Sequence, residues 1–216
     1  MNAIVSRTSW ALVAAGVMFG CAGCGLYASR QGKFTVWAGL LNGLSFRGDE
    51  WILDVGCGRG AVLLMAAKRL TTGRAIGVDL WKRADQSGNA IEATKRNAAA
   101  EGVADLVELR TADMTTLPFE DSTFDLVLSS LAIHNVRGWA GRDQAIEQVV
   151  RVLRPGGRLM IADLWATRQY SLCLAKLGMA NISRRGLGWR MWWSGPWLPT
   201  HLVTATKPLV RRPESE

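Results

Sequence analysis

The residues best suited to chemistry lie in one glycine-rich stretch, DVGCGRGA, which spans residues 54–61. Gly56, Gly58 and Ala61 fit the spacing G-x-G-x-x-G/A, in which the missing side chains permit a tight turn and let a ligand approach the backbone. Asp79 follows roughly twenty residues further on, where a carboxylate is suited to bind ribose hydroxyls. Together these residues predict a binding site for a cofactor that contains adenosine.

Two kinds of cofactor fit this pattern, a nicotinamide dinucleotide and S-adenosylmethionine. A dinucleotide has an anionic pyrophosphate, which binds best to bare backbone N–H groups at a helix N-terminus. S-adenosylmethionine has a cationic sulfonium and an ammonium, so the acid at the end of the first strand, Asp54, suits it and would repel pyrophosphate. A further acid, Asp113 in TADM, is placed to accept a hydrogen bond from the adenine amino group. These acids favour S-adenosylmethionine. An oxidoreductase that uses a nucleotide is the alternative, and a cofactor-binding protein without catalysis is a second one.

Short apolar runs that alternate with helical patterns must position these residues. Strands are expected over residues 51–55, 74–79, 105–111, 124–130 and 158–164, with β-like stretches at 181–186 and 201–207. Helices are expected over 61–70, 89–102, 142–153 and 168–179, the third closed by a Pro-Gly-Gly turn at 155–157. Nearly continuous apolar strands between helices predict a parallel sheet covered on both faces, with ligands bound at the carboxyl ends of the strands.

Four successive motifs resemble those of the class I S-adenosylmethionine-dependent methyltransferases: LDVGCGRG, GVDL, TADMTTLPFEDSTFDLVLSS and RVLRPGGRL. The resemblance covers about residues 51–164. It implies a Rossmann-like α/β fold with a seven-stranded, mostly parallel sheet, helices on both faces and a reversed last strand, for which THLVTATKP is the candidate. It also implies methyl transfer from S-adenosylmethionine. The cofactor-binding residues that it implies are Asp54, Gly56, Cys57, Gly58, Gly60, Asp79, Leu80, Asp113, Met114 and Ser129.

The side of the site that binds the methyl acceptor has fewer candidate residues. His134 follows the fourth strand and is the candidate general base, because histidine titrates in the useful range. A base is needed only if the acceptor's nucleophilic atom carries a proton, so a structural role for His134 stays open. No Asn-Pro-Pro-Tyr type loop occurs, which lowers the odds of an amide or nucleobase nitrogen as target. The acceptor is expected to be small or lipophilic.

The N-terminal segment 10–29 contains no charged residue. Its twenty residues would span about 30 Å as a helix, the thickness of a hydrocarbon core. Arg7 precedes the segment, whereas Arg30 and Lys33 follow it, which slightly favours a cytoplasmic catalytic domain. S-adenosylmethionine is made inside cells, which favours the same side. The segment therefore predicts a single membrane-spanning anchor ahead of the domain.

The residues after the anchor have their own pattern. Apolar residues between Gln31 and Asp49 recur at helical spacing, which predicts an amphipathic segment that packs on the domain or lies at the membrane surface. The chain is expected to comprise an anchor with its flanks over 1–33, a connecting helix over 34–50, the methyltransferase domain over 51–210 and a polar tail over 211–216.

Composition narrows the range of partners. The net charge is +8, but the basic residues are scattered, so binding to nucleic acid is not favoured. Four cysteines and two histidines give a metal site few ligands, and none is expected. Four of ten tryptophans lie within Gly188–Trp197. They fit a membrane-interface patch, an aromatic wall for a substrate or simple packing over the sheet edge, and packing is favoured for at least two. The sequence does not indicate an oligomeric state.

Overall fold

The computed structural model describes residues 2–82 and 88–209, so the polar tail expected at 211–216 lies outside the described residues. One seven-stranded sheet has the order β3-β2-β1-β4-β5-β7-β6. Its strands are β1 (Trp51–Val55), β2 (Arg74–Asp79), β3 (Val107–Thr111), β4 (Phe124–Ser130), β5 (Leu153–Asp163), β6 (Ala180–Gly186) and β7 (His201–Thr206). Because β7 runs antiparallel to both β5 and β6, the predicted fold with a reversed last strand is confirmed.

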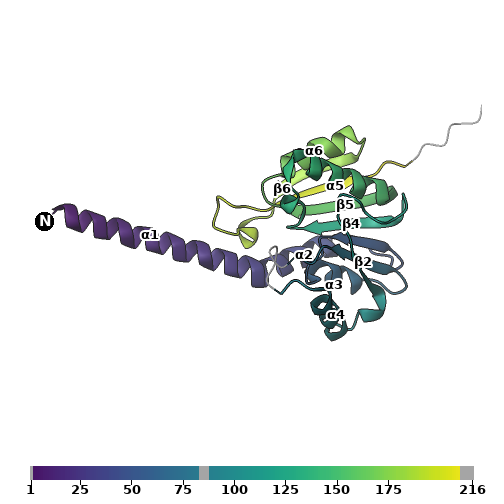
Figure 1. Ribbon diagram of the computed structural model, residues 1–216, viewed down its shortest axis with the longest axis horizontal. Helices are drawn as coiled ribbons and strands as arrows, with labels where there is room; N and C mark the ends of the chain where they lie inside the picture. Colours follow the sequence, from purple (N-terminus) through teal and green to yellow (C-terminus); the bar gives the residue numbers. More distant parts are fainter. Residues whose placement is uncertain (1, 83–87, 210–216) are drawn as a thin grey trace, which may run out of the picture.

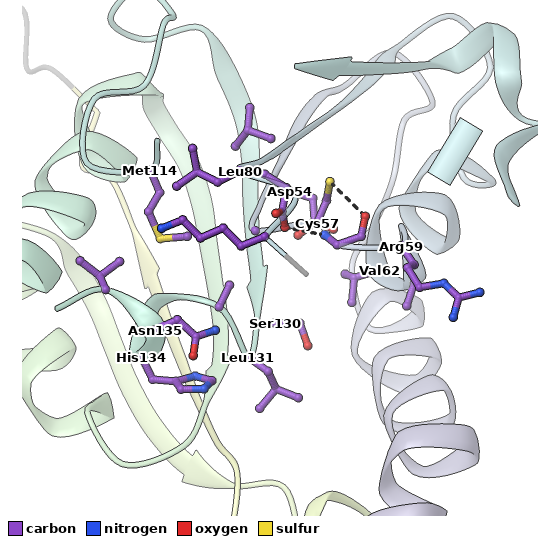
Figure 2. Close-up of a pocket in the computed structure, with 18 of the residues that line it drawn as sticks. Asp54, Cys57, Arg59, Val62, Leu80, Met114, Ser130, Leu131, His134 and Asn135 are labelled. Atoms are coloured by element: carbon purple, nitrogen blue, oxygen red, sulfur yellow. Dashed lines mark hydrogen bonds between the residues drawn. The ribbon is translucent and has the colours of Figure 1, made fainter. Parts of the chain in front are cut away.

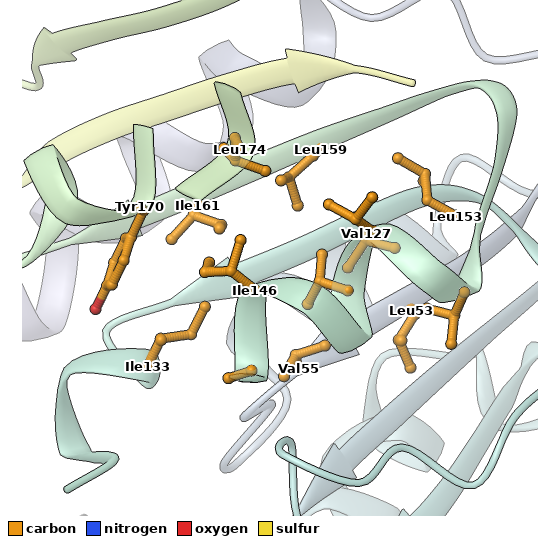
Figure 3. Packing of buried hydrophobic residues seen from close by; sticks show 14 of the residues in the cluster. Leu53, Val55, Val127, Ile133, Ile146, Leu153, Leu159, Ile161, Tyr170 and Leu174 are labelled. Carbon is orange, nitrogen blue, oxygen red and sulfur yellow. The ribbon is translucent and has the colours of Figure 1, made fainter. Parts of the chain in front are cut away.

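Helices cover both faces of the sheet (Figure 1). One layer contains α5 (Gly138–Val152) and α6 (Thr167–Lys176). The other contains α2 (Lys33–Asn42), α3 (Ala61–Ala67) and α4 (Ile91–Ala100). Successive side chains of a strand point to opposite faces, so β1 directs Leu53 and Val55 toward α5 and α6 but Ile52 toward α2 and α3. Figure 3 shows the first of these two cores, in which Ile146 and Tyr170 pack over the strands.

The boundary predicted between the helix at 142–153 and the strand at 158–164 is wrong. Residues 155–157 do not form a turn after the helix, because β5 begins directly at Leu153, where α5 ends. Leu153 pairs with Phe124 of β4, and the Gly156 N–H donates to the carbonyl of Lys207 at 2.7 Å. The Pro-Gly-Gly segment therefore forms a bulge in β5, where the pairing with β4 shifts register, and backbone hydrogen bonds with Lys207 hold it beside the end of β7.

A long helix leads into the domain (Figure 1). It comprises α1 (Asn2–Tyr27), a π-helical stretch at Ala28–Gly32, and α2. Trp37 and Leu41 of α2 are completely buried, whereas Trp10 and Phe19 of α1 are largely exposed. The helix over Ser9–Asn42 is long and apolar enough to cross a membrane: its most apolar 18-residue stretch has a mean hydropathy of 1.8, and 6% of that stretch is buried. The connecting helix predicted over 34–50 thus packs on the domain, but it continues the long helix and ends at Asn42 rather than at residue 50.

The base of this helix fits closely against the loop between β6 and β7. A Cβ atom at Gly32 would lie 1.9 Å from the carbonyl oxygen of Arg190, and one at Gly25 would lie 2.7 Å from that of Trp193. Tyr27 stacks on Trp189 with ring centroids 5.0 Å apart. The small residues are required because the two backbones touch, and this contact sets the direction in which α1 leaves the domain.

Candidate active site

A cavity of about 670 Å³ opens at the carboxyl ends of β1, β2 and β4 (Figure 2). The predicted site residues that line it are Asp54, Gly56, Cys57, Gly58, Asp79, Leu80, Asp113, Met114 and His134. Ser29 and Lys33, from the base of the N-terminal helix, and Trp193, from the loop after β6, complete part of the wall. The topology therefore brings residues from both ends of the chain to one site.

The glycine-rich loop has the backbone geometry that its sequence predicts. Gly56 has φ +74°, and a Cβ atom there would lie 2.2 Å from the Cβ of Ala132. The Gly58 N–H donates to Asp79 Oδ2 at 2.9 Å, and the hydroxyl of Thr94 donates to the Gly58 carbonyl at 2.7 Å. The loop between β1 and α3 is thus fixed in place and leaves its backbone uncovered on the cavity side.

Asp54 is a buried acid with an unfilled hydrogen-bonding position. It is 1% exposed, and its Oδ1 has no hydrogen-bond partner among the described residues. Burial raises the pKa of Asp54 to about 7, a backbone hydrogen bond from Leu63 acts against this rise, and the charge of Asp79 adds to it. A buried carboxylate oxygen without a partner is costly, so the site fits a ligand that supplies a cationic donor. The ammonium of S-adenosylmethionine is such a group.

The pKa of Asp54 gives a pH dependence for cofactor binding. Only the ionised carboxylate pairs with an ammonium, so affinity should be full above pH 7 and should fall as the acid becomes protonated below it. We expect the Kd of S-adenosylhomocysteine, measured by calorimetry, to rise about tenfold for each pH unit below 7. Asp54→Asn should remove this dependence. A Kd that is constant from pH 5.5 to 7.5 in the wild type would contradict the assignment.

Asp79 lies at the end of β2, beside the glycine-rich loop that follows the neighbouring strand β1. Besides Gly58, it accepts hydrogen bonds from the Trp81 N–H at 2.7 Å and from Asn89 Nδ2 at 3.3 Å. These donors hold the carboxylate at the cavity, where further lone pairs remain for hydroxyl groups. Trp81 itself is not in the cavity wall, because its indole donates to the Thr111 hydroxyl at 2.9 Å and packs against the sheet.

Asp113 and Met114 lie after β3 at the rim of the cavity. The Asp113 carboxylate accepts hydrogen bonds from the N–H and the hydroxyl of Thr115, each at 2.8 Å, and these bonds lower its pKa. The acid therefore stays ionised and is held in one orientation. Leu80 and Met114 add apolar surface to the same part of the cavity, which suits the flat face of an adenine.

Two residues of the predicted set take supporting positions instead. Ser129 is buried, and its hydroxyl donates to the Val55 carbonyl at 2.8 Å, so Ser130 rather than Ser129 reaches the cavity wall. Successive side chains of a strand point in opposite directions, which explains why only one of these two neighbouring serines reaches the cavity. Gly60 caps α3 with φ +85° and packs against Thr94, where a Cβ atom would lie 2.9 Å from the Thr94 methyl group. Cys57 reaches the cavity but is 94% buried, since its relative exposure is 6%.

His134 is held by an acid that the sequence analysis missed. Its Nδ1 lies 2.5 Å from Oδ1 of Asp163, and its backbone N–H donates to Oδ2 at 3.0 Å. Asp163 is completely buried and also accepts from the Tyr170 hydroxyl at 3.0 Å and from the Leu164 N–H at 2.9 Å. Four donors thus satisfy this carboxylate. Asp163 ends β5, and the rule that functional residues follow the strands would have found it.

The pairing with Asp163 determines which ring nitrogen of His134 is free to accept a proton. Because the carboxylate faces Nδ1, the neutral imidazole has its proton on Nδ1 and leaves Nε2 as an acceptor. The ring lines the cavity and meets Trp165 edge to face, with centroids 5.4 Å apart. Figure 2 shows His134 and Asn135 together on one wall, with Asp54 on another. The arrangement can take a proton from a group in the cavity.

The reversed β7 and the glycine-rich loop between β1 and α3 define a Rossmann-like cofactor-binding domain. Residues 53–161 match the family described as methyltransferase domain. Since this match covers half of the chain, the protein belongs to the class I S-adenosylmethionine-dependent methyltransferases. S-adenosylmethionine is the cofactor of this family, so the oxidoreductase alternative is set aside.

Individual relatives agree with this membership. Demethylmenaquinone methyltransferase of Symbiobacterium thermophilum is 38% identical over 119 residues, which are 55% of this chain and 44% of that protein. A ubiquinone/menaquinone biosynthesis C-methyltransferase of Roseobacter denitrificans is 36% identical over 124 residues, 57% of this chain and 46% of that protein. The chain thus spans about half the length of these curated relatives. Geranyl diphosphate methyltransferase, solved with S-adenosylmethionine, shares the fold, with a TM-score of 0.64 and 19% identity over 81% of this chain and 85% of that one.

Proposed function

We propose that the protein is a membrane-anchored methyltransferase that transfers the methyl group of S-adenosylmethionine to a small, lipophilic acceptor carrying an acidic proton. One observation supports this most directly: an unpaired buried acid, Asp54, and a histidine paired with an acid, His134, line the same cavity. In this proposal Asp54 serves the cofactor and His134 serves the acceptor.

Each residue of this chain has a distinct task. When bound, S-adenosylmethionine supplies a methyl group that its sulfonium makes electrophilic. Asp54 would pair with the ammonium, Asp79 would accept from the ribose hydroxyls, and the rim formed by Leu80, Asp113 and Met114 would hold the adenine. His134 would take at Nε2 the proton that the acceptor's nucleophilic atom loses, and Asp163 would stabilise the imidazolium that results. The cavity walls would hold the methyl donor and the acceptor in line for the transfer.

The apolar N-terminal helix supports a membrane location and a lipophilic acceptor. We infer that residues 1–33 anchor the chain in a single pass, that 34–50 connect it, and that the domain over 51–210 lies on the cytoplasmic side, where the cofactor is made. Ser29 and Lys33 lie both at the end of this anchor and in the cavity wall. The names of the quinone and geranyl diphosphate methyltransferases likewise point to lipophilic acceptors.

A single preparation tests the anchor and the activity together. Membranes that contain the full-length chain are washed with high salt and then incubated with S-adenosylmethionine labelled in its methyl group. The chain should remain bound, because apolar insertion is not screened by salt, and label should enter the fraction soluble in organic solvent. Membranes with His134→Ala serve as the control. Release of the chain by salt would contradict the anchor, and label confined to proteins or nucleic acids would contradict a lipophilic acceptor.

A further inference from the structure

Exposed tryptophans gather at the edge of the sheet where the cavity opens. Trp139 follows β4, Trp165 follows β5, and Trp189 and Trp197 lie in the loop between β6 and β7. All four are between 52% and 68% exposed. Water-exposed indole rings are unfavourable in isolation but are common at membrane interfaces, where the ring is buried and its N–H stays hydrated. Neither the fold nor the proposed chemistry explains this exposure.

The charge beside these tryptophans is positive, whereas the acids of this edge, Asp54, Asp79 and Asp113, lie after β1, β2 and β3 on the cofactor side of the cavity. The segments that contain these tryptophans, 134–142, 164–170 and 186–201, and the base of the N-terminal helix at 28–33 contain no Asp or Glu. Their basic residues are Arg30, Lys33, Arg137, Arg142, Arg168 and Arg190. Arg190 lies over the ring of Trp189 at 4.8 Å, and Arg142 lies over that of Trp139 at 5.4 Å. Tryptophan together with basic residues and no acids matches the headgroup region of an anionic bilayer.

The N-terminal helix leaves the domain at this same edge. The contacts of Gly25 and Gly32 with the loop after β6 fix its base there, and Ser29 lines the cavity mouth. Figure 1 shows α1 projecting away from the domain on the side of that loop. A membrane that contains α1 must therefore lie next to the exposed tryptophans rather than behind the domain.

We propose that the carboxyl edge of the sheet lies on the anionic surface of the membrane that holds α1, with the cavity opening toward the lipid headgroups. This inference rests on the proposed anchor. An acceptor dissolved in the bilayer then reaches His134 without crossing water, and the domain does not rotate freely about its anchor. The tryptophan-rich loop serves as part of a membrane-binding face in addition to packing on the helix.

Fluorescence quenching by brominated lipid tests this arrangement on the full-length chain. The protein is reconstituted into vesicles of phosphatidylglycerol and phosphatidylcholine brominated near the headgroup end of its acyl chains. Emission of Trp10→Phe, Trp51→Phe, Trp139→Phe and Trp197→Phe variants is subtracted from that of the wild type, which isolates each indole. Trp51 is the matched control, because it is exposed but begins β1 at the opposite edge of the sheet. We expect Trp139 and Trp197 to lose about half or more of their emission and Trp51 to lose none.

The outcomes separate this inference from the anchor. Quenching of Trp10 without quenching of Trp139 and Trp197 would overturn the membrane-bound edge and leave the anchor intact. Absence of quenching at Trp10 would show that the anchor itself is wrong. Vesicles without phosphatidylglycerol should lower the quenching of Trp139 and Trp197 but not that of Trp10. Equal quenching with and without the anionic lipid would overturn the role assigned to the basic residues.

Discussion

Replacing His134 by alanine should lower turnover by about two to four orders of magnitude while leaving the Kd of S-adenosylhomocysteine near that of the wild type. The physical reason is that His134 alone offers an oriented imidazole to the cavity, with Asp163 at 2.5 Å from its Nδ1. Removing it takes away the proton acceptor but no group assigned to the cofactor. The rate of methyl transfer can be measured in a single-turnover experiment. The Kd of S-adenosylhomocysteine can be measured by calorimetry.

A conservative change at Asp163 refines the same test. Asp163→Asn keeps the shape of the residue but no longer stabilises an imidazolium, so turnover should fall while the cofactor still binds. Circular dichroism controls for folding, since the carboxylate is completely buried. Turnover within a few-fold of the wild type in His134→Ala would show that alignment alone carries the reaction.

Asp79→Ala should weaken S-adenosylhomocysteine binding by about ten- to a hundredfold. Hydrogen bonds to a charged acceptor contribute about 1.5–3 kcal/mol, and the proposed role of this carboxylate is to accept from both ribose hydroxyls. The variant also removes the partner of the Gly58 N–H, which loosens the loop that the cofactor contacts. Calorimetry at pH 8, where Asp54 is ionised, measures the change in affinity.

A matched control for this variant is Asp105→Ala. Asp105 is an exposed acid in the turn before β3 and does not line the cavity, so its loss should leave the Kd unchanged. An Asp79→Ala variant that folds and still binds with the wild-type affinity would exclude Asp79 from the cofactor site.

Much of the fold follows from local patterns in the sequence. The apolar strands and their intervening helices alternate clearly enough to predict the sheet, and DVGCGRGA marks the first turn because glycines there must adopt positive φ. The acids that end β1 and β2 were predicted in the same way, since ligands of such sheets bind beyond the carboxyl ends of the strands. These features depend on residues that are close in sequence.

Features that depend on contacts between distant residues were not predicted. The position of Asp163 at the end of β5 marks it as a candidate, but its pairing with His134, 29 positions away, follows from no local pattern. The start of β5 at Leu153 depends on pairing with Phe124 and on a hydrogen bond to Lys207. The choice of Ser130 over Ser129 for the cavity depends on the exact register of β4, which a one-residue shift would invert. The docking of Gly25 and Gly32 on the loop after β6 joins the two ends of the chain, so neither segment reveals it alone.

The π-helical stretch at Ala28–Gly32 determines how α1 is rotated about its axis relative to α2. Each residue of an α-helix turns the chain by about 100°, so a π-helical insertion changes the angle between the face that α1 presents to its surroundings and the face that α2 buries. Trp37 and Leu41 set the second angle, and their burial leaves no freedom to adjust it. The number of residues between α1 and α2 therefore fixes which side of α1 faces the domain. A change in the length of α1 at its N-terminal end would not rotate the helix relative to the domain.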